Sequence, residues 1–196
     1  MNKVAKSENK WLEWWNAPWH TKDRIERFET LDKYLTTPPK RILDIGCGLA
    51  RESEYFQKKY GTELYLLDGD FNTTKNKPRD NFWGSAESFK FYSPVAELKK
   101  SFHEREMSYT WVDAENPYID ENIKFDLIYS FLSCGFHYPA ITYRELIKKH
   151  SNEDTIVIID CRNDTFEQQS KDFEIVDIIS KTHHYIDYKR MQIRFK

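Results

Sequence analysis

The sequence predicts one doubly wound α/β domain: a mostly parallel seven-stranded sheet with an antiparallel last strand and helices on both faces. Apolar runs of strand length alternate with stretches of helical periodicity, as in a parallel sheet with crossover helices. The tripeptide GCG stands between the first of these runs and a helical stretch. The last two runs are only about nine residues apart, too close for a helical crossover, so they should pair antiparallel.

The composition is that of a globular domain without covalent cross-links. The chain has 196 residues, of which 39% are hydrophobic and 32% charged, enough to bury a core. We treat 1–35 as a helical, aromatic-rich N-terminal segment and 40–196 as the core of the same domain, 1–196. Cys47, Cys134 and Cys161 form no CxxC pair, so neither a disulfide framework nor a zinc site is expected, and no metal is assigned.

The charge pattern limits the partners. Thirty basic residues nearly balance thirty-two acidic ones, and no basic stripe is visible, which disfavours nucleic acid and favours a small molecule. No apolar run reaches the length of about 18 residues that marks a membrane span. The polar N-terminus does not resemble a signal peptide, so a cytoplasmic protein is expected, and its oligomeric state stays open.

Each element follows from a local pattern. The strands are expected at 41–46, 63–68, 107–113, 125–131, 154–162, 173–179 and 189–196. Helices are expected at 9–20, 21–35, 50–60, 93–106, 139–150 and 165–172. Pro18 should end the first helix, and Thr21 or Asp23 should cap the second. In the third helix, Phe56 and Tyr60 should face inward.

The segment LDIGCGLA, residues 43–50, is the central motif. Its glycines allow a sharp turn and close approach of a ligand at the start of a helix. Dinucleotide binding would need a third glycine where Arg51 stands, and the Walker pattern is absent. Asp44 would repel a pyrophosphate but pair with an ammonium, while the helix start can face a carboxylate; S-adenosylmethionine carries both groups and no phosphate. A purely structural tight turn is the alternative.

Acidic residues follow the next two strands. Asp68 ends the second strand, twenty residues after Gly48, where doubly wound folds hold ribose hydroxyls, and Asp70 is a second candidate. Asp113 ends the third strand and could accept from an adenine amino group. Each alone could be an ordinary loop carboxylate. Carboxyl ends of parallel strands meet at one edge of the sheet, however, so together they indicate one ligand site.

These motifs resemble those of class I S-adenosylmethionine-dependent methyltransferases. LDIGCGLA resembles the family's motif I, LLDGD its acidic motif, WVDAE its adenine motif and FDLIYSF the strand that carries motif IV. The resemblance covers about residues 40–196, with Ala50 where the family usually has glycine. It implies a Rossmann-like fold, S-adenosylmethionine as cofactor and S-adenosylhomocysteine as product. The residues it places at the cofactor are Asp44, Gly46, Cys47, Gly48, Ala50, Asp68, Gly69, Asp113, Ala114 and Ser130.

The segment after the fourth strand bears on the acceptor. Family members that modify adenine or exocyclic amines in nucleic acids carry a Pro-Pro pair here, and cytosine C5 enzymes carry Pro-Cys. This chain has neither pair after Ser130. SCGFHYP (133–139), with residues 82–94, is similar to methyltransferases found with bacterial surface-glycan genes. That similarity favours a sugar or nucleotide-sugar acceptor.

His137 is the predicted general base and Tyr138 a second catalytic candidate. His137 follows the fourth strand, where the donor methyl should point, and an unperturbed histidine titrates near neutral pH. The alternatives are that His137 only hydrogen-bonds within its loop and that Tyr138 packs or orients. The Trp-rich residues 1–20 could form a lid or pack on the sheet, and residues 69–94 could contact the substrate.

The predicted function is methyl transfer to a small-molecule hydroxyl, with a sugar favoured. A methyltransferase acting on RNA or protein is one alternative. A protein that binds S-adenosylmethionine without catalysis is another.

Overall fold

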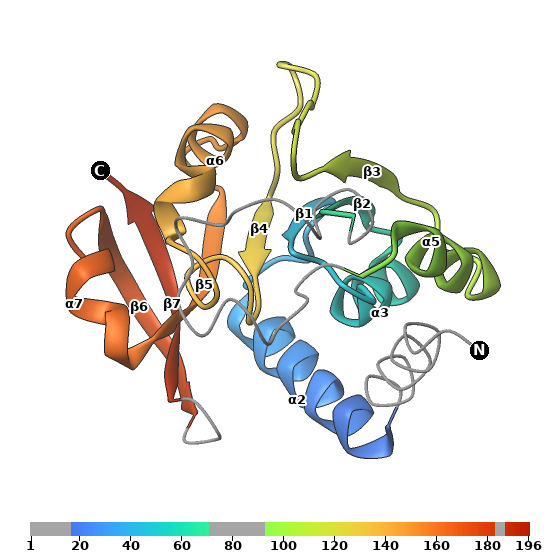
Figure 1. Cartoon of the computed structure of the whole chain (residues 1–196), viewed down its shortest axis with the longest axis horizontal. Coiled ribbons are helices and arrows are strands. Elements are labelled where there is room, and N and C mark those ends of the chain that lie inside the picture. Colours follow the sequence, from blue (N-terminus) through green and yellow to red (C-terminus); the bar gives the residue numbers. More distant parts are fainter. Residues whose placement is uncertain (1–16, 71–92, 183–186) are drawn as a thin grey trace, which may run out of the picture.

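The computed structural model describes residues 17–70, 93–182 and 187–196 (Figure 1). Its seven-stranded sheet has the order β3-β2-β1-β4-β5-β7-β6. The strands are β1 (Arg41–Ile45), β2 (Glu63–Asp68), β3 (Thr110–Asp113), β4 (Leu127–Ser130), β5 (Ile156–Arg162), β6 (Phe173–Thr182) and β7 (Tyr188–Phe195). Strands β1 to β5 pair in parallel, and β7 runs antiparallel to both β5 and β6. The predicted fold class and the antiparallel last strand are confirmed.

Helices cover both faces of the sheet. They are α2 (Pro18–Tyr34), α3 (Arg51–Tyr60), α5 (Val95–Glu104), α6 (Arg144–His150) and α7 (Phe166–Gln169), with 3-10 turns at Ala140–Tyr143 and Asn163–Thr165. Side chains of α2, α3 and α5, including Leu31, Phe56 and Phe102, share one buried cluster with the strands. None of the described helices combines the length and hydropathy needed to cross a bilayer.

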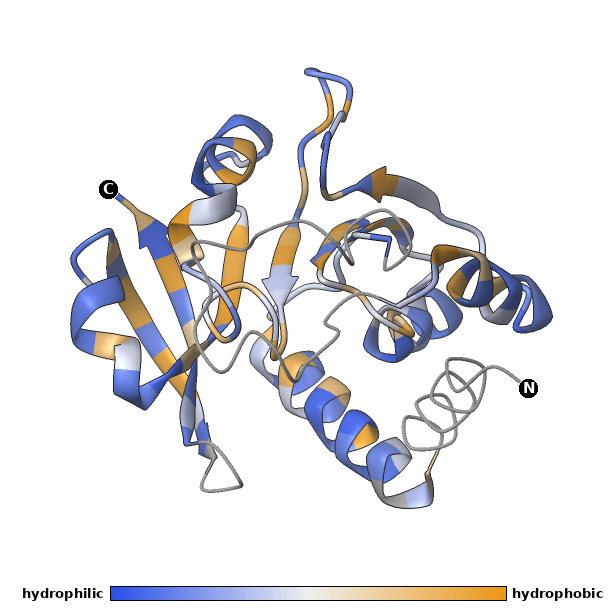
Figure 2. Ribbon diagram, in the orientation of Figure 1, coloured by the Kyte–Doolittle hydropathy of each residue, from blue (hydrophilic) through white to orange (hydrophobic). Residues whose placement is uncertain are grey.

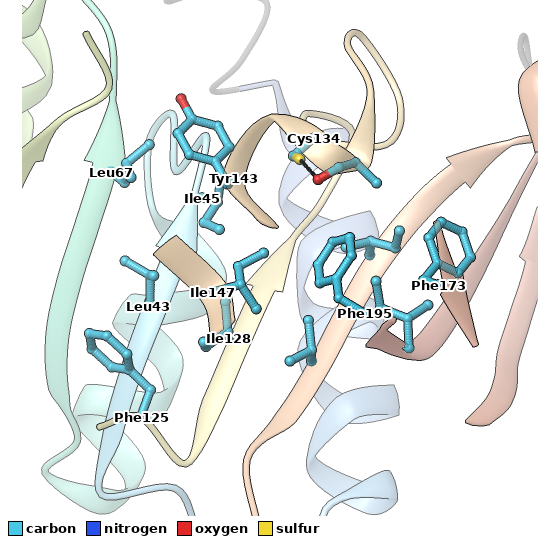
Figure 3. Close-up of a cluster of buried hydrophobic side chains, with 14 of the residues drawn as sticks. Leu43, Ile45, Leu67, Phe125, Ile128, Cys134, Tyr143, Ile147, Phe173 and Phe195 are labelled. Atoms are coloured by element: carbon cyan, nitrogen blue, oxygen red, sulfur yellow. Dashed lines mark hydrogen bonds between the residues drawn. The ribbon is translucent and has the colours of Figure 1, made fainter. Parts of the chain in front are cut away.

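The second buried cluster covers the opposite face. In it, Tyr143 and Ile147 pack on Leu43 and Ile45 of β1 and Leu67 of β2 (Figure 3). Apolar strands lie between helices whose outer surfaces are mostly hydrophilic (Figure 2). Burial on two faces explains why β1 and β2 are mostly apolar at successive positions instead of alternating between apolar and polar residues.

Two local expectations were wrong. Helix α2 begins at Pro18 and has Ala17 as its N-cap, so Thr21 and Asp23 lie inside the helix instead of capping it, while most of the predicted helix 9–20 lies outside the described residues. Proline suits the first helical position, where no intrahelical N–H bond is lost. Tyr60 is 37% exposed although Phe56 is fully buried, because its hydroxyl bonds to Asp32 at the surface.

Candidate functional site

The predicted cofactor residues gather at the carboxyl ends of four neighbouring strands. The glycine loop, defined as residues 46–50, follows β1. Asp68 ends β2 directly opposite Asp113 of β3, and Ser130 ends β4 on the other side of β1. This edge of an open α/β sheet is where ligands bind. The structure therefore brings together the residues that the sequence identified separately.

Asp68 joins the glycine loop to the end of β2. Its Oδ2 accepts the Gly48 N–H at 2.8 Å, and its Oδ1 accepts the Gly69 N–H at 2.8 Å. Burial raises the pKa of this carboxyl to about 6, opposed by the two amide hydrogen bonds. A carboxylate offers about four acceptor positions, so two amides leave capacity for a ligand diol.

Gly46 and Gly48 serve different neighbours. Both have positive φ, +72° and +48°. A Cβ on Gly46 would lie 1.8 Å from Ser133 Oγ, so this glycine makes room for the segment after β4. A Cβ on Gly48 would meet no atom of the described residues within 4 Å. Close approach of a ligand, expected of both glycines, is therefore supported at Gly48.

Asp44 lies in a buried polar cluster between β1, β4 and α3. Its Oδ2 accepts hydrogen bonds from Ser53 Oγ at 2.8 Å and Tyr129 OH at 2.9 Å. Burial raises the pKa of Asp44 to about 8, while these two hydrogen bonds lower it. The Asp44 carboxyl thus connects the start of α3 to β4 through these two hydrogen bonds. A direct contact with a cofactor ammonium stays a prediction.

The remaining loop residues support the turn. Ala50 adopts a left-handed conformation, φ +48°, as N-cap of α3, which explains why glycine suits this place. Cys47 is buried, and burial raises the pKa of its thiol well above the usual value. Their roles at a cofactor stay predictions.

Asp113 and Ala114 follow β3 beside Asp68. The Ala114 N–H donates to the Asp68 carbonyl at 3.0 Å, so the two strand ends are joined. Asp113 is exposed, and its Oδ1 accepts the Glu115 N–H at 2.9 Å. This carboxylate is accessible to an adenine amino group.

Ser130 links β4 to β1. Its Oγ donates to the Ile45 carbonyl and accepts the Cys134 N–H, both at 2.8 Å, and the side chain is buried. These bonds hold the end of β4 beside the glycine loop. A contact between Ser130 and the cofactor stays a prediction.

Ser133 and Tyr138 form a hydroxyl pair that sequence reasoning found only in part. Ser133 Oγ lies 2.9 Å from Tyr138 OH and occupies the space that Gly46 leaves free. Tyr138 was a candidate, but Ser133 was missed. Its signal was its place in SCGFHYP directly after the fourth strand.

His137 lies next to this pair. Its backbone N–H donates to the Ser133 carbonyl at 2.7 Å, and its ring meets the Phe136 ring edge to face at 5.0 Å between centroids. Burial, aided by the charge of Arg162, lowers the pKa of His137 to about 4. The imidazole is therefore neutral at neutral pH, as a base must be, but it binds a proton more weakly than an unperturbed histidine.

A cavity of about 690 Å³ lies at the opposite edge of the sheet. It is lined at the amino ends of β2 and β3 by residues that include Gln57, Glu63 and Thr110. Ligands of open α/β sheets bind at the carboxyl ends instead. This cavity is therefore separate from the candidate site.

Several predicted contacts lie outside the described residues. They include the tryptophans at positions 11, 14 and 15 and all of residues 71–92. The proposed lid and the substrate contacts of the 69–94 segment stay predictions.

The Asp44 cluster predicts a pH dependence of stability. A carboxyl whose pKa is raised in the folded state binds more protons than in the unfolded chain, so stability falls as pH rises toward the folded pKa. Asp68 adds to this fall in stability only up to about pH 6. His137 and His20, with pKa values lowered to about 4, make stability rise with pH, and they do so only below about pH 6.5. Between pH 6.5 and 8 the decline is therefore assigned to Asp44.

Urea unfolding across that interval checks this expectation. Asp44→Asn should flatten the decline, and Asp113→Asn, an exposed control, should leave it unchanged. An equal slope in wild type and Asp44→Asn would exclude Asp44 as the titrating group.

Comparison with known proteins supports the fold. No protein-family model matches the chain, and no curated protein matches it in sequence. The crystal structure of the plantazolicin methyltransferase BpumL, with a triazolic desmethylPZN analog and SAH, is similar at TM-score 0.54 and 19% identity, covering 85% of this chain and 57% of that one. This chain thus spans little more than half the length of BpumL.

Two further structures cover more of their own length. A ribosomal protein L11 methylase from Lactobacillus delbrueckii subsp. bulgaricus is similar at TM-score 0.56 and 15% identity, over 90% of this chain and 79% of that one. A methyltransferase from Pyrococcus furiosus is similar at TM-score 0.57 and 14% identity, over 88% and 83%. The chain therefore has the Rossmann-like α/β fold of these methyltransferase structures.

Proposed function

We propose that this protein is an S-adenosylmethionine-dependent methyltransferase whose acceptor is a small-molecule hydroxyl, with a sugar or nucleotide-sugar favoured. The observation that carries the proposal is the arrangement of Asp68: a buried carboxylate that joins two loops and keeps acceptor capacity, beside an open Gly48. The solved structures of the same fold support it, since BpumL was crystallised with SAH.

The residues present fit this cofactor. Asp68 would accept from the ribose hydroxyls, and Asp113 with Ala114 would lie at the adenine. Gly48 leaves space where a side chain would stand, and the N-terminus of α3 would face the cofactor carboxylate. When bound, S-adenosylmethionine supplies an electrophilic methyl group on a good leaving group.

The chain's own residues then have to position the acceptor. The Ser133–Tyr138 pair offers two hydroxyls at the β4 side of the loop, suited to a neutral polar acceptor. His137 would take the acceptor proton. Its lowered pKa is compatible with this role because a hydroxyl oxygen becomes strongly acidic as its new bond to carbon forms. The similarity of residues 133–139 to glycan-associated methyltransferases favours a sugar.

Mass spectrometry of acceptor mixtures tests the proposal. Purified protein with S-adenosylmethionine should add 14 Da, one methyl in place of hydrogen, to a member of a sugar and nucleotide-sugar panel. RNA and peptide panels are run in parallel. Methylation confined to RNA or peptides would replace the proposed acceptor class, and cofactor binding with no transfer to any panel would favour a non-catalytic protein.

His137 has a distinct kinetic expectation. His137→Ala should lower turnover roughly a hundredfold, within the usual contribution of a general base. With a pKa of about 4, the wild-type rate should stay level from pH 8 to pH 6 and fall only in more acidic buffer. His137→Gln, which keeps a polar side chain but accepts no proton, should be as slow as His137→Ala. Full turnover in either variant would remove the assignment.

A further inference from the structure

We propose that the buried ion pair between Asp160 and Arg190 is a positioning device that sets the β4 turn, residues 131–135, and thereby holds the Ser133–Tyr138 pair at the glycine loop. The inference rests on the proposed function for its catalytic meaning. All the contacts of the ion pair used below are between described residues.

The ion pair is bidentate and inaccessible to water. Asp160 of β5 lies opposite Arg190 of β7 in the antiparallel register. Arg190 Nε donates to Oδ1 and Nη2 to Oδ2, both at 2.8 Å, and the side chains are 3% and 0% exposed. Buried pairs of this kind rarely stabilise a fold more than apolar residues of similar volume would. Stability alone therefore does not account for it.

Asp160 bonds to the β4 turn at Leu132 and approaches it closely at Gly135. Its Oδ2 also accepts the Leu132 N–H at 3.2 Å, and Leu132 has φ +51°, a conformation that leucine rarely adopts. The backbone carbonyl oxygen of Asp160 lies so close to Gly135 that a Cβ on Gly135 would be 2.7 Å from it. The Gly135 carbonyl also accepts from Gln169 Nε2 at 2.9 Å. The left-handed Leu132 persists because its surroundings determine it.

Arg190 holds the first residue of the turn. Its guanidinium lies 3.9 Å from the centroid of the Phe131 ring. Phe131 stacks on Tyr129 at 4.6 Å, and Tyr129 OH donates to Asp44 beneath the glycine loop. The two partners of the ion pair thus contact Phe131 and Leu132, the two residues before Ser133. This arrangement sets where Ser133 Oγ meets Gly46.

A paired substitution separates positioning from stability. Asp160→Leu with Arg190→Met replaces the ion pair by apolar side chains of similar size, so no uncompensated charge stays buried. It also removes the acceptor of the Leu132 N–H and the cation on Phe131. Arg190→Met alone leaves a buried carboxylate unpaired and should be much less stable than the double variant.

The measurements are urea unfolding, native-state hydrogen exchange by NMR and calorimetric S-adenosylhomocysteine binding. In the double variant we expect stability to recover toward wild type while the Leu132 amide exchanges at least about tenfold faster and affinity falls about tenfold. The control is Arg41→Met, which breaks the partly exposed Arg41–Glu63 pair at the amino end of β1. It should change neither the exchange rate of the Leu132 amide nor the affinity for S-adenosylhomocysteine.

A stable double variant with wild-type Leu132 exchange and wild-type affinity would overturn the proposal. If that variant does not fold, Arg190→Lys keeps the charge but loses the bidentate contact. Faster Leu132 exchange in Arg190→Lys supports positioning, and unchanged exchange contradicts it. Leu132 exchange is measured without cofactor, so failure of the proposed function, seen as no binding by wild type, is a separate result.

Discussion

Asp68→Ala is expected to weaken S-adenosylhomocysteine binding about a hundredfold, the loss of about 2.7 kcal/mol that a charge-assisted hydrogen-bonded contact supplies. Two effects combine in this variant. The ribose would lose its acceptor, and the Gly48 and Gly69 amides would lose the carboxylate that holds them. Equilibrium dialysis with labelled ligand measures the change.

Asp68→Asn is the matched variant. An amide keeps one acceptor oxygen and no charge, so binding should weaken about tenfold, between wild type and alanine. Asp70→Ala, at the second acidic position considered from sequence, should bind normally. Equal affinity of wild type and Asp68→Ala would remove Asp68 from the cofactor site.

Gly46→Ala is expected to destabilise the protein by about 2–5 kcal/mol. A left-handed alanine costs about 1–2 kcal/mol, and forcing its Cβ against Ser133 adds about 1–3 kcal/mol of overpacking. Chemical unfolding at constant pH measures the loss.

Two variants isolate the clash from the backbone strain. Gly48→Ala has a similarly positive φ but no described atom within 4 Å of the new Cβ, so it should cost only the strain, about 1–2 kcal/mol. Ser133→Gly removes the two Ser133 atoms that would clash with the new Cβ and should recover part of the stability of Gly46→Ala. If Gly46→Ala and Gly48→Ala lose equal stability, the segment after β4 does not pack on Gly46 as described.

The fold was predictable because its signals are local. The strands β1 and β2 are short, mostly apolar and buried on both faces, and each is followed or ended by a residue that the sequence marks: Gly46 after β1 and Asp68 at the end of β2. The short connection between β6 and β7 required antiparallel pairing whatever the rest of the sheet did.

The parts of the site that escaped prediction depend on distant partners. Glycine at position 46 suits a ligand or a neighbouring side chain equally well, and only the fold shows that Ser133 fills the space. The hydroxyl of Ser130 bonds to Ile45 and Cys134, partners that no local pattern indicates, while its predicted contact with the cofactor stays a prediction. The lowered pKa of His137 likewise depends on burial and on Arg162, which ends β5. No periodicity in one chain encodes such pairings.

The proposed function requires the carboxyl edge of β1, β2 and β3 to bind S-adenosylmethionine. Calorimetric titration of the wild-type chain, residues 1–196, with S-adenosylmethionine and S-adenosylhomocysteine tests this binding most directly. One site per chain with micromolar affinity for both ligands is expected. A folded protein that gives no binding heat with either ligand, at several temperatures, would contradict the methyltransferase proposal and leave the fold without its assigned ligand.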